Sequence, residues 1–200
     1  QSGDIVWGLR RGLKLRADPY PRVRHTSSLS CGATLSIRNL KSFFRPRTIG
    51  LVGASNRAGS VGNVIAKNLL AGGFGPALSF INPKGEVILG VQSVPTVDDL
   101  AEAPELAVLA TPPATVPGLV RSLGARGTKA VVVITAGFGS GDLGPDGKPL
   151  SQALLEATRP YGTRIIGPNC LGILAPTLRL NASFSHVASN PGGLAFVVQS

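Results

Sequence analysis

Residues 53–62 read Gly-Ala-Ser-Asn-Arg-Ala-Gly-Ser-Val-Gly, a glycine-rich stretch between a short apolar run and a helical pattern. The glycines let a ligand approach the backbone closely. Ser60 stands where a cap of the following helix is expected, so free amides and the helix dipole would favour an anion there, above all a phosphate. A plain strand-to-helix turn would use the same glycines, and this loop alone leaves both interpretations open.

Lys84, in Asn82-Pro83-Lys84, is the second chemically informative position. Folds that bind NAD place an acidic residue after the second strand, where it accepts hydrogen bonds from ribose hydroxyls. A cation suits a ligand with a phosphate on that ribose instead, which means NADP or coenzyme A (CoA) with its 3'-phosphate. A lysine in a turn is more often simply solvated, so Lys84 alone does not decide the ligand.

Three further loops carry unusual residues after apolar runs. Thr111-Pro112-Pro113 would form a rigid apolar wall, which suits an adenine face or a pantetheine arm. Thr135-Ala136-Gly137 is small and glycine-rich, and Gly167-Pro168-Asn169-Cys170 follows the last predicted strand of this series. Two prolines at a helix start need no ligand to explain them.

Strand-like and helix-like patterns alternate along the chain and would place these loops at one edge of a sheet. The predicted strands are 48–52, 77–81, 87–91, 106–110, 130–134 and 164–166, and the predicted helices are 61–69, 97–100, 116–123 and 150–157. Parallel strands need crossover helices, which cover both sheet faces. The sequence therefore predicts an α/β, Rossmann-like parallel sheet with helices on both faces, whose ligands bind at the carboxyl ends of the strands.

Composition and charge exclude several other classes. The chain has 200 residues, of which 43% are apolar and 15% charged, so it is not disordered as a whole. The longest apolar runs, among them 130–134 and 194–198, are far too short to cross a membrane. The net charge is +10, but residues 1–49 hold ten basic against two acidic residues, whereas residues 50–200 hold ten against eight. The basic charge therefore belongs to the N-terminal segment, and we expect no nucleic-acid partner and no membrane.

The basic segment at residues 1–34 lacks a sustained apolar period, and we interpret it as a disordered or non-native leader. An arginine- and serine-rich leader can also be a transit peptide. The chain contains no methionine, which indicates a fragment.

Taken together, the motifs resemble a known family. The series Arg47 to Ser55, Asn82-Pro83-Lys84, Ala110 to Pro113, Ile134 to Phe138 and Gly167 to Gly172 is similar to the CoA-binding domain of NDP-forming acyl-CoA synthetases, relatives of the succinyl-CoA synthetase alpha subunit. The resemblance runs from about residue 35 to 200. It implies a CoA-binding, Rossmann-like domain at 35–168, then a linker and the truncated start of a second, flavodoxin-like ligase domain at 169–200, with 194–198 as its first strand.

The resemblance also implies which residues line the CoA site. These are Gly53, Ser55, Asn56, Arg57, Gly59, Ser60, Val61, Asn82, Lys84, Thr111, Pro112, Pro113, Thr135, Ala136, Gly137 and Asn169. It implies no catalytic residue and no metal ligand in this chain. The family's phosphohistidine matches neither His25 nor His186, and we expect Cys170 to be a small buried residue rather than a nucleophile.

The function that the resemblance implies is that of an ADP-forming acid-thiol ligase. Such an enzyme would make acyl-CoA from CoA and a small carboxylic acid, using ATP and Mg²⁺, through an acyl phosphate and a phosphohistidine. It would be cytoplasmic and would need downstream ligase and ATP-grasp domains in cis or in trans. Two alternatives stay open: the CoA-binding part of a bifunctional protein lysine acetyltransferase, suggested by residues 111–117 and 180–184, and a stand-alone CoA-binding module. An NADP-dependent oxidoreductase ranks last, because no proton donor stands out.

Overall fold

The computed structural model describes residues 37–139 and 141–197. The chain divides into two units, Gln1–Leu35 and Ser36–Ser200, and the described residues belong to the second. The predicted leader, with His25 and Cys31, therefore lies outside the described residues.

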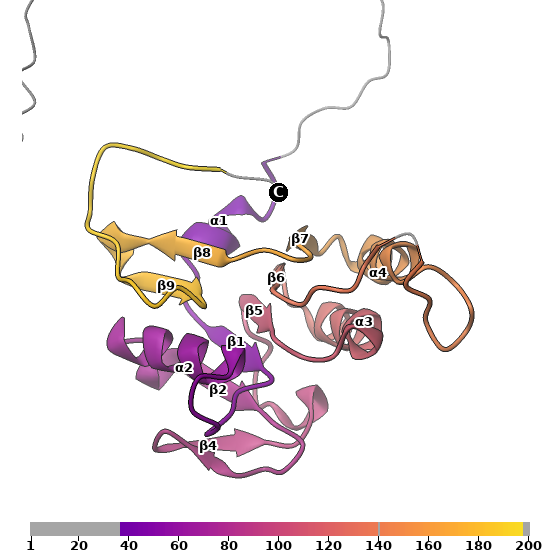
Figure 1. Ribbon diagram of the computed structural model, residues 1–200, viewed down its shortest axis with the longest axis horizontal. Coiled ribbons are helices and arrows are strands. Elements are labelled where there is room, and N and C mark those ends of the chain that lie inside the picture. Colours follow the sequence, from indigo (N-terminus) through magenta and orange to yellow (C-terminus); the bar gives the residue numbers. More distant parts are fainter. Residues whose placement is uncertain (1–36, 140, 198–200) are drawn as a thin grey trace, which may run out of the picture. The chain divides into compact units, whose positions relative to one another are not determined.

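A seven-stranded, mostly parallel sheet forms the centre of this unit (Figure 1). Its strands lie in the order β3-β4-β2-β1-β5-β6-β7, and only the short edge strand β3 runs antiparallel to its neighbour. The bounds are Ile49–Val52 for β1, Leu78–Ile81 for β2, Val87–Ile88 for β3, Val91–Val94 for β4, Leu106–Leu109 for β5, Ala130–Val133 for β6 and Arg164–Ile166 for β7. The predicted parallel α/β sheet is confirmed.

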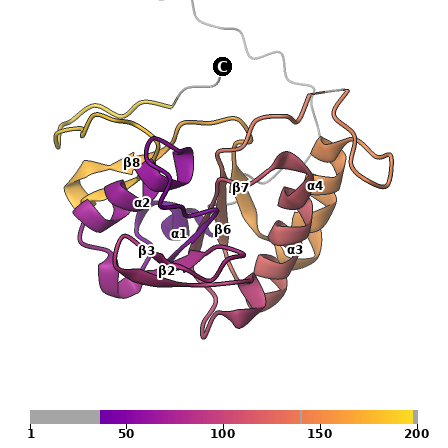
Figure 2. The ribbon, with the colours of Figure 1, turned by 60° about the horizontal axis from the view of Figure 1, so that its bottom comes forward.

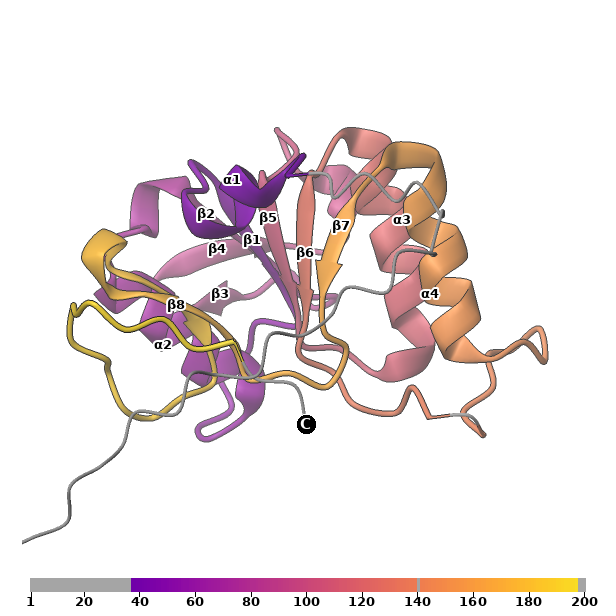
Figure 3. The ribbon, with the colours of Figure 1, turned by 90° about the horizontal axis from the view of Figure 1, so that it is seen from above.

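Helices cover both faces of the sheet, as predicted. Helices α3 (Val116–Arg126) and α4 (Leu150–Thr158) lie together on one face, and α1 (Leu40–Phe44) and α2 (Val61–Ala71) lie on the other (Figures 2 and 3). Within residues 37–139 and 141–197, short 3-10 turns connect elements at Gly75–Ala77, Val97–Asp99, Pro113–Thr115, Arg159–Tyr161 and Pro176–Leu178.

The sequence of β5 shows why the sheet is buried on both faces. Leu106 and Val108 pack into the core that contains α2, whereas Ala107 and Leu109 pack into the core that contains α3 and α4. Successive side chains of a strand point to opposite faces, so a strand covered on both faces needs an unbroken apolar run. All four side chains are fully buried.

The predicted single strand at 87–91 is wrong, because the segment is a hairpin. Strand β3 ends at Ile88 and β4 begins at Val91, and Leu89 and Gly90 form the turn between them with φ of 49° and 85°. Positive φ at both central residues is typical of the turn that matches the twist of a two-residue hairpin. Leucine is an uncommon residue at such a position, so the apolar run concealed the turn.

A second hairpin occupies part of the predicted linker. Strands β8 (Gly172–Ala175) and β9 (Leu180–Ser183) pair antiparallel with each other, and β9 packs against α2. Ile173, Leu180 and Ala182 are buried in the same core as α2. The first domain therefore continues beyond residue 168, and the linker interpretation is corrected for residues 172–183.

The last described residues do not form the strand that the apolar run predicts. The side chains of Leu194, Phe196 and Val197 are exposed, no strand includes them, and Val198 lies outside the described residues. Their assignment to a second domain stays a prediction. Within the described part, no helix is long and apolar enough to span a lipid bilayer.

Candidate functional site

The loops after β2, β1, β5, β6 and β7 meet at the carboxyl edge of the sheet, and hydrogen bonds join several of them. The Asn82 Nδ2 donates to the Ala54 carbonyl (2.7 Å), which joins the β2 and β1 loops. The Thr135 Oγ1 donates to the Thr111 carbonyl (2.7 Å), and the Asn169 backbone N–H donates to the Thr135 carbonyl (2.9 Å). The predicted site residues all lie in these loops or at the first residue of the helix that follows, so the fold brings them to one edge.

Glycines allow the β1 loop and the start of α2 to lie against the strand ends. Gly53 has φ of 92°, and a Cβ there would collide with the Ala110 carbonyl oxygen. A Cβ at Gly62 would collide with the Gly53 carbonyl oxygen. Because only glycine fits these contacts, residues 53–60, which we call the phosphate loop, bring backbone amides close to the sheet edge.

The N-terminus of α2 presents unused hydrogen-bond donors. Ser60 caps the helix as predicted, since its Oγ accepts from the Asn63 N–H (3.3 Å) and donates to the Arg57 carbonyl (2.8 Å). Within the described residues, the backbone N–H groups of Val61 and Gly62 have no acceptor. The first turn holds no acidic side chain, so the positive end of the helix dipole is not compensated. The geometry suits an anion.

Two exposed cations lie in the loops after β1 and β2 at this edge of the sheet. Arg57 lies in the phosphate loop, and Lys84 follows β2 at the neighbouring strand end. Neither side chain forms a hydrogen bond or an ion pair with any residue that the structure describes. The Lys84 backbone N–H donates to the Asn82 Oδ1 (2.8 Å), which fixes the turn but leaves the ammonium group available for a ligand.

The loops after β5 and β6 pack against each other beside the phosphate loop. A Cβ at Gly137, whose φ is 92°, would lie 3.1 Å from the Pro113 side chain. Pro112 is exposed, and Thr115 donates its hydroxyl hydrogen within the turn that begins there. Both prolines therefore lie at this edge, and their role as an apolar wall for a cofactor stays a prediction.

Two asparagines connect the phosphate loop to its surroundings. Asn63 is 2% exposed, and its Nδ2 donates to the Ser55 carbonyl (2.9 Å). No pattern in the sequence indicated this role, because a polar residue at the third position of a helix usually faces solvent. Asn56, predicted to contact a cofactor, bonds instead through both polar atoms to the β3–β4 hairpin.

Cys170 lies beside this edge as a half-buried thiol. Its Sγ is 3.3 Å from the Val133 carbonyl oxygen, to which the thiol donates. Burial raises the pKa of the Cys170 thiol, so the reactive thiolate is scarce at neutral pH. Cys170 is poorly suited to act as a nucleophile.

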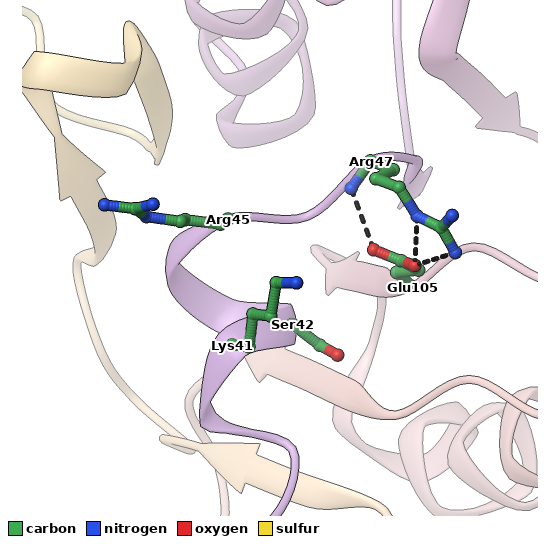
Figure 4. A pocket seen from close by; sticks show the side chains of 5 residues that line it. All are labelled: Lys41, Ser42, Arg45, Arg47 and Glu105. Atoms are coloured by element: carbon green, nitrogen blue, oxygen red, sulfur yellow. Dashed lines mark hydrogen bonds and ion pairs between the residues drawn. The ribbon is translucent and has the colours of Figure 1, made fainter.

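A pocket of about 340 Å³ lies at the opposite edge of the sheet, near the amino ends of β1 and β5 (Figure 4). Lys41, Ser42, Arg45, Arg47 and Glu105 line it. The Glu105 carboxylate accepts hydrogen bonds from the Arg47 backbone N–H (2.9 Å) and from its Nε (2.7 Å). These contacts lower the pKa of Glu105, and the hydrogen bond from the Arg47 backbone N–H contributes most. Ligands of parallel sheets bind at the carboxyl edge, so we assign the Arg47–Glu105 pair a structural role.

Comparisons with known proteins place this geometry in a family. The model of a family described as "CoA binding domain" matches residues 47–176. The chain is 37% identical over 161 residues to acetate–CoA ligase [ADP-forming] I of Archaeoglobus fulgidus, which covers 80% of this chain and 23% of that protein. It is 35% identical over 166 residues to the alpha subunit of acetate–CoA ligase [ADP-forming] I of Pyrococcus furiosus. That match covers 81% of this chain and 36% of the subunit.

A solved structure agrees with these relatives. The dinucleotide-forming acetyl-coenzyme A synthetase 1 of Ca. Korarchaeum cryptofilum, in complex with phosphate and ADP, superimposes with a TM-score of 0.66 at 36% identity. The match covers 72% of this chain and 30% of the other. The chain thus spans about a quarter to a third of the length of these three proteins.

Proposed function

The chain belongs to the family of CoA-binding domains, and we propose that it forms the CoA-binding portion of an ADP-forming acyl-CoA synthetase. The observation that carries the proposal is the N-terminus of α2, with two unused backbone donors and no acidic residue in its first turn, together with two unpaired cations in the loops at the same edge of the sheet. CoA combines a diphosphate with a 3'-phosphate, and a helix N-terminus with two cations at the same sheet edge suits such a polyanion.

Each part of the edge has a proposed partner in CoA. The Val61 and Gly62 N–H groups would donate to the diphosphate, and the Lys84 ammonium would bind the 3'-phosphate. The pantetheine arm would lie along Pro112 and Pro113 and continue past Thr135, Ala136 and Gly137 towards Asn169. This path follows the loops from β1 across β5 and β6 to β7, which are neighbours in the sheet.

The complete reaction is also part of the proposal. It would join a small carboxylic acid to CoA, with ATP and Mg²⁺ and with ligase and ATP-grasp domains that lie outside this chain. The two ligases and the synthetase that the chain matches support this, since they are named for acetate or acetyl-CoA, and one of them is a separate alpha subunit. We expect a cytoplasmic location, because the free thiol of CoA persists in a reducing compartment.

The test removes one backbone donor without disturbing the helix. Proline is favoured at the first position of a helix, and Ser60, which precedes Val61, has the extended conformation that a following proline requires (ψ 150°). The variant Val61→Pro therefore loses only the N–H at this position, whereas Val61→Ala keeps it and serves as the matched control. A hydrogen bond to a charged group contributes about 1.5–3 kcal/mol, so we expect Val61→Pro to weaken CoA binding by roughly tenfold or more.

Isothermal titration calorimetry of the 200-residue chain measures the effect. We expect CoA to bind the unmodified chain and Val61→Ala equally, and NADP to bind much more weakly. Absence of CoA binding, or tighter binding of NADP than of CoA, would refute the proposed function. Equal CoA affinities of Val61→Pro and Val61→Ala would show that the helix N-terminus is not where CoA binds.

A further inference from the structure

The exposed tip of the phosphate loop, residues 56–59, is anchored to another element through Asn56. The other hydrogen bonds of the tip are local: the Arg57 N–H donates to the Ser55 Oγ (3.0 Å), and the Ser60 Oγ donates to the Arg57 carbonyl. Among the described residues, Asn56 is the tip residue whose side chain reaches outside the loop. The position of the tip therefore depends on what Asn56 contacts.

Asn56 contacts the backbone of the β3–β4 hairpin with both atoms of its amide. Its Nδ2 donates to the Val87 carbonyl (2.7 Å), and its Oδ1 accepts from the Leu89 N–H (3.2 Å). Along an edge strand, the carbonyl of one residue and the N–H of the residue two positions later point to the same side, as the Val87 carbonyl and the Leu89 N–H do. A side-chain amide offers one donor and one acceptor that match this pair. This pairing uses one N–H donor and the oxygen of the Asn56 amide and holds the side chain against the hairpin.

The hairpin is a firm support for the loop. Ile88 is fully buried in the core, and β4 pairs in parallel with β2. The Ser93 Oγ donates to the Glu86 carbonyl (2.6 Å), which closes the open end of the hairpin. A segment held by core packing and by ladder hydrogen bonds opens less often than an exposed loop tip does. Asn56 thus links the exposed loop tip to a hairpin that is held by the core.

The turn of the hairpin is strained at the residue that Asn56 holds. Leu89 has φ of 49°, which is uncommon for a residue with a branched side chain. Residues in such conformations persist where their surroundings fix them, and they gather at functional sites. The hydrogen bond from Leu89 to Asn56 stabilises this turn, so the turn and the loop tip hold each other in place.

The geometry assigns Asn56 the role of a positioning residue, which keeps the phosphate loop in its CoA-binding shape through the β3–β4 hairpin. This inference rests on the proposed CoA-binding function and adds to it a part of the molecule outside the five loops. A loop that already has its bound shape loses less conformational freedom when the ligand arrives, so affinity rises without a new contact. Asn56 then contributes to binding without touching CoA.

Limited proteolysis and calorimetry together test this role in the 200-residue chain. Trypsin can cut after Arg57 in the exposed tip and, for comparison, after Arg179 in the turn of the β8–β9 hairpin. For Asn56→Ala, and for Asn56→Asp, which places a carboxylate against the Val87 carbonyl, we expect several-fold faster cleavage after Arg57 without ligand. Cleavage after Arg179 should stay unchanged, and CoA affinity should fall several-fold.

Gln92→Ala is the matched control. The Gln92 Nε2 donates to the Gly85 carbonyl (2.8 Å) in the same hairpin but does not bond to the phosphate loop. We expect this variant to match the unmodified chain in cleavage after Arg57 and in CoA affinity.

The two measurements separate the inference from the function on which it rests. If the Asn56 variants bind CoA as tightly as the unmodified chain, the positioning role is overturned. Weaker binding with unchanged cleavage after Arg57 would overturn it too, because Asn56 would then contact CoA directly. If the unmodified chain does not bind CoA, the proposed function fails, while faster cleavage after Arg57 in the variants would still support the link between loop and hairpin.

Discussion

Lys84 distinguishes CoA from ligands without a phosphate on the ribose. Its ammonium group is exposed and unpaired within the described part of the chain, next to the loop that would hold the diphosphate. We expect Lys84→Gln to weaken CoA binding by about tenfold, because a charge-assisted contact is lost. The variant should bind CoA and dephospho-CoA equally, whereas the unmodified chain should prefer CoA in calorimetry.

Lys129→Gln is the control for this change. Lys129 is an exposed lysine that precedes β6 at the amino edge of the sheet, so its removal changes the net charge equally without approaching the site. If Lys129→Gln weakens CoA binding as much as Lys84→Gln does, the effect is one of overall charge and the assignment of Lys84 is wrong.

Single residues were predictable where their role depends on backbone geometry. Ser60 as a cap and Gly53 as a close-approach residue follow from the strand-loop-helix pattern alone. The roles of Asn56 and Asn63 were not predictable, because each side chain bonds to a carbonyl whose position depends on how the chain folds. Side-chain types indicate that a polar bond forms, but they do not identify its partner.

At the scale of elements, the Arg47–Glu105 pair joins the amino ends of β1 and β5. The hydrogen bonds from Arg47 make the pKa of Glu105 lower in the folded protein than in the unfolded chain. The contact therefore stabilises the fold at pH values above the pKa of Glu105 in the unfolded chain. This stabilisation is lost as the pH falls through the lower pKa of the folded protein. The Arg47 side chain is 86% exposed, so solvent screens the pair and its contribution to the free energy of unfolding is small. We expect Glu105→Gln to lower Tm by about 1–3 °C at pH 7.

Thermal unfolding, followed by circular dichroism between pH 7 and pH 3, measures how the effect of Glu105→Gln on Tm changes with pH. The difference in Tm between Glu105→Gln and the unmodified chain should shrink as the pH falls. Glu102→Gln is the control, since Glu102 is exposed and bonds to no described residue. A difference that grows towards low pH would contradict the assigned role of the Arg47–Glu105 pair.

The central strands were predictable as elements, and the two hairpins were not. The runs at 106–110 and 130–134 are unbroken apolar segments of the length that a doubly covered strand requires. The β3–β4 turn uses Leu89 where a glycine or asparagine would have signalled it. In β8 and β9 the strands are short, and Asn181 interrupts the apolar pattern, so only the packing on α2 shows that they belong to the core.

At the scale of the whole molecule, the described residues supply a place for CoA but no group arranged for phosphoryl transfer. His186 is exposed, lies outside every helix and strand, and has no hydrogen-bond or ion-pair partner among the described residues. A nucleophilic side chain needs a neighbouring base or charge to activate and orient it. Within the described part of the chain, no such neighbour contacts His186.

The final prediction is that this 200-residue chain, tested alone, binds CoA but does not make acyl-CoA. Phosphoryl transfer depends on groups that hold the nucleotide and stabilise the charge of the transferred phosphate, and in our proposal the exposed Arg57 and Lys84 bind CoA instead. We expect no label on the chain after incubation with γ-labelled ATP, and no release of ADP when acetate and CoA are added. Acid-labile, base-stable phosphate on His186 would contradict this prediction and move the phosphoryl acceptor into this chain.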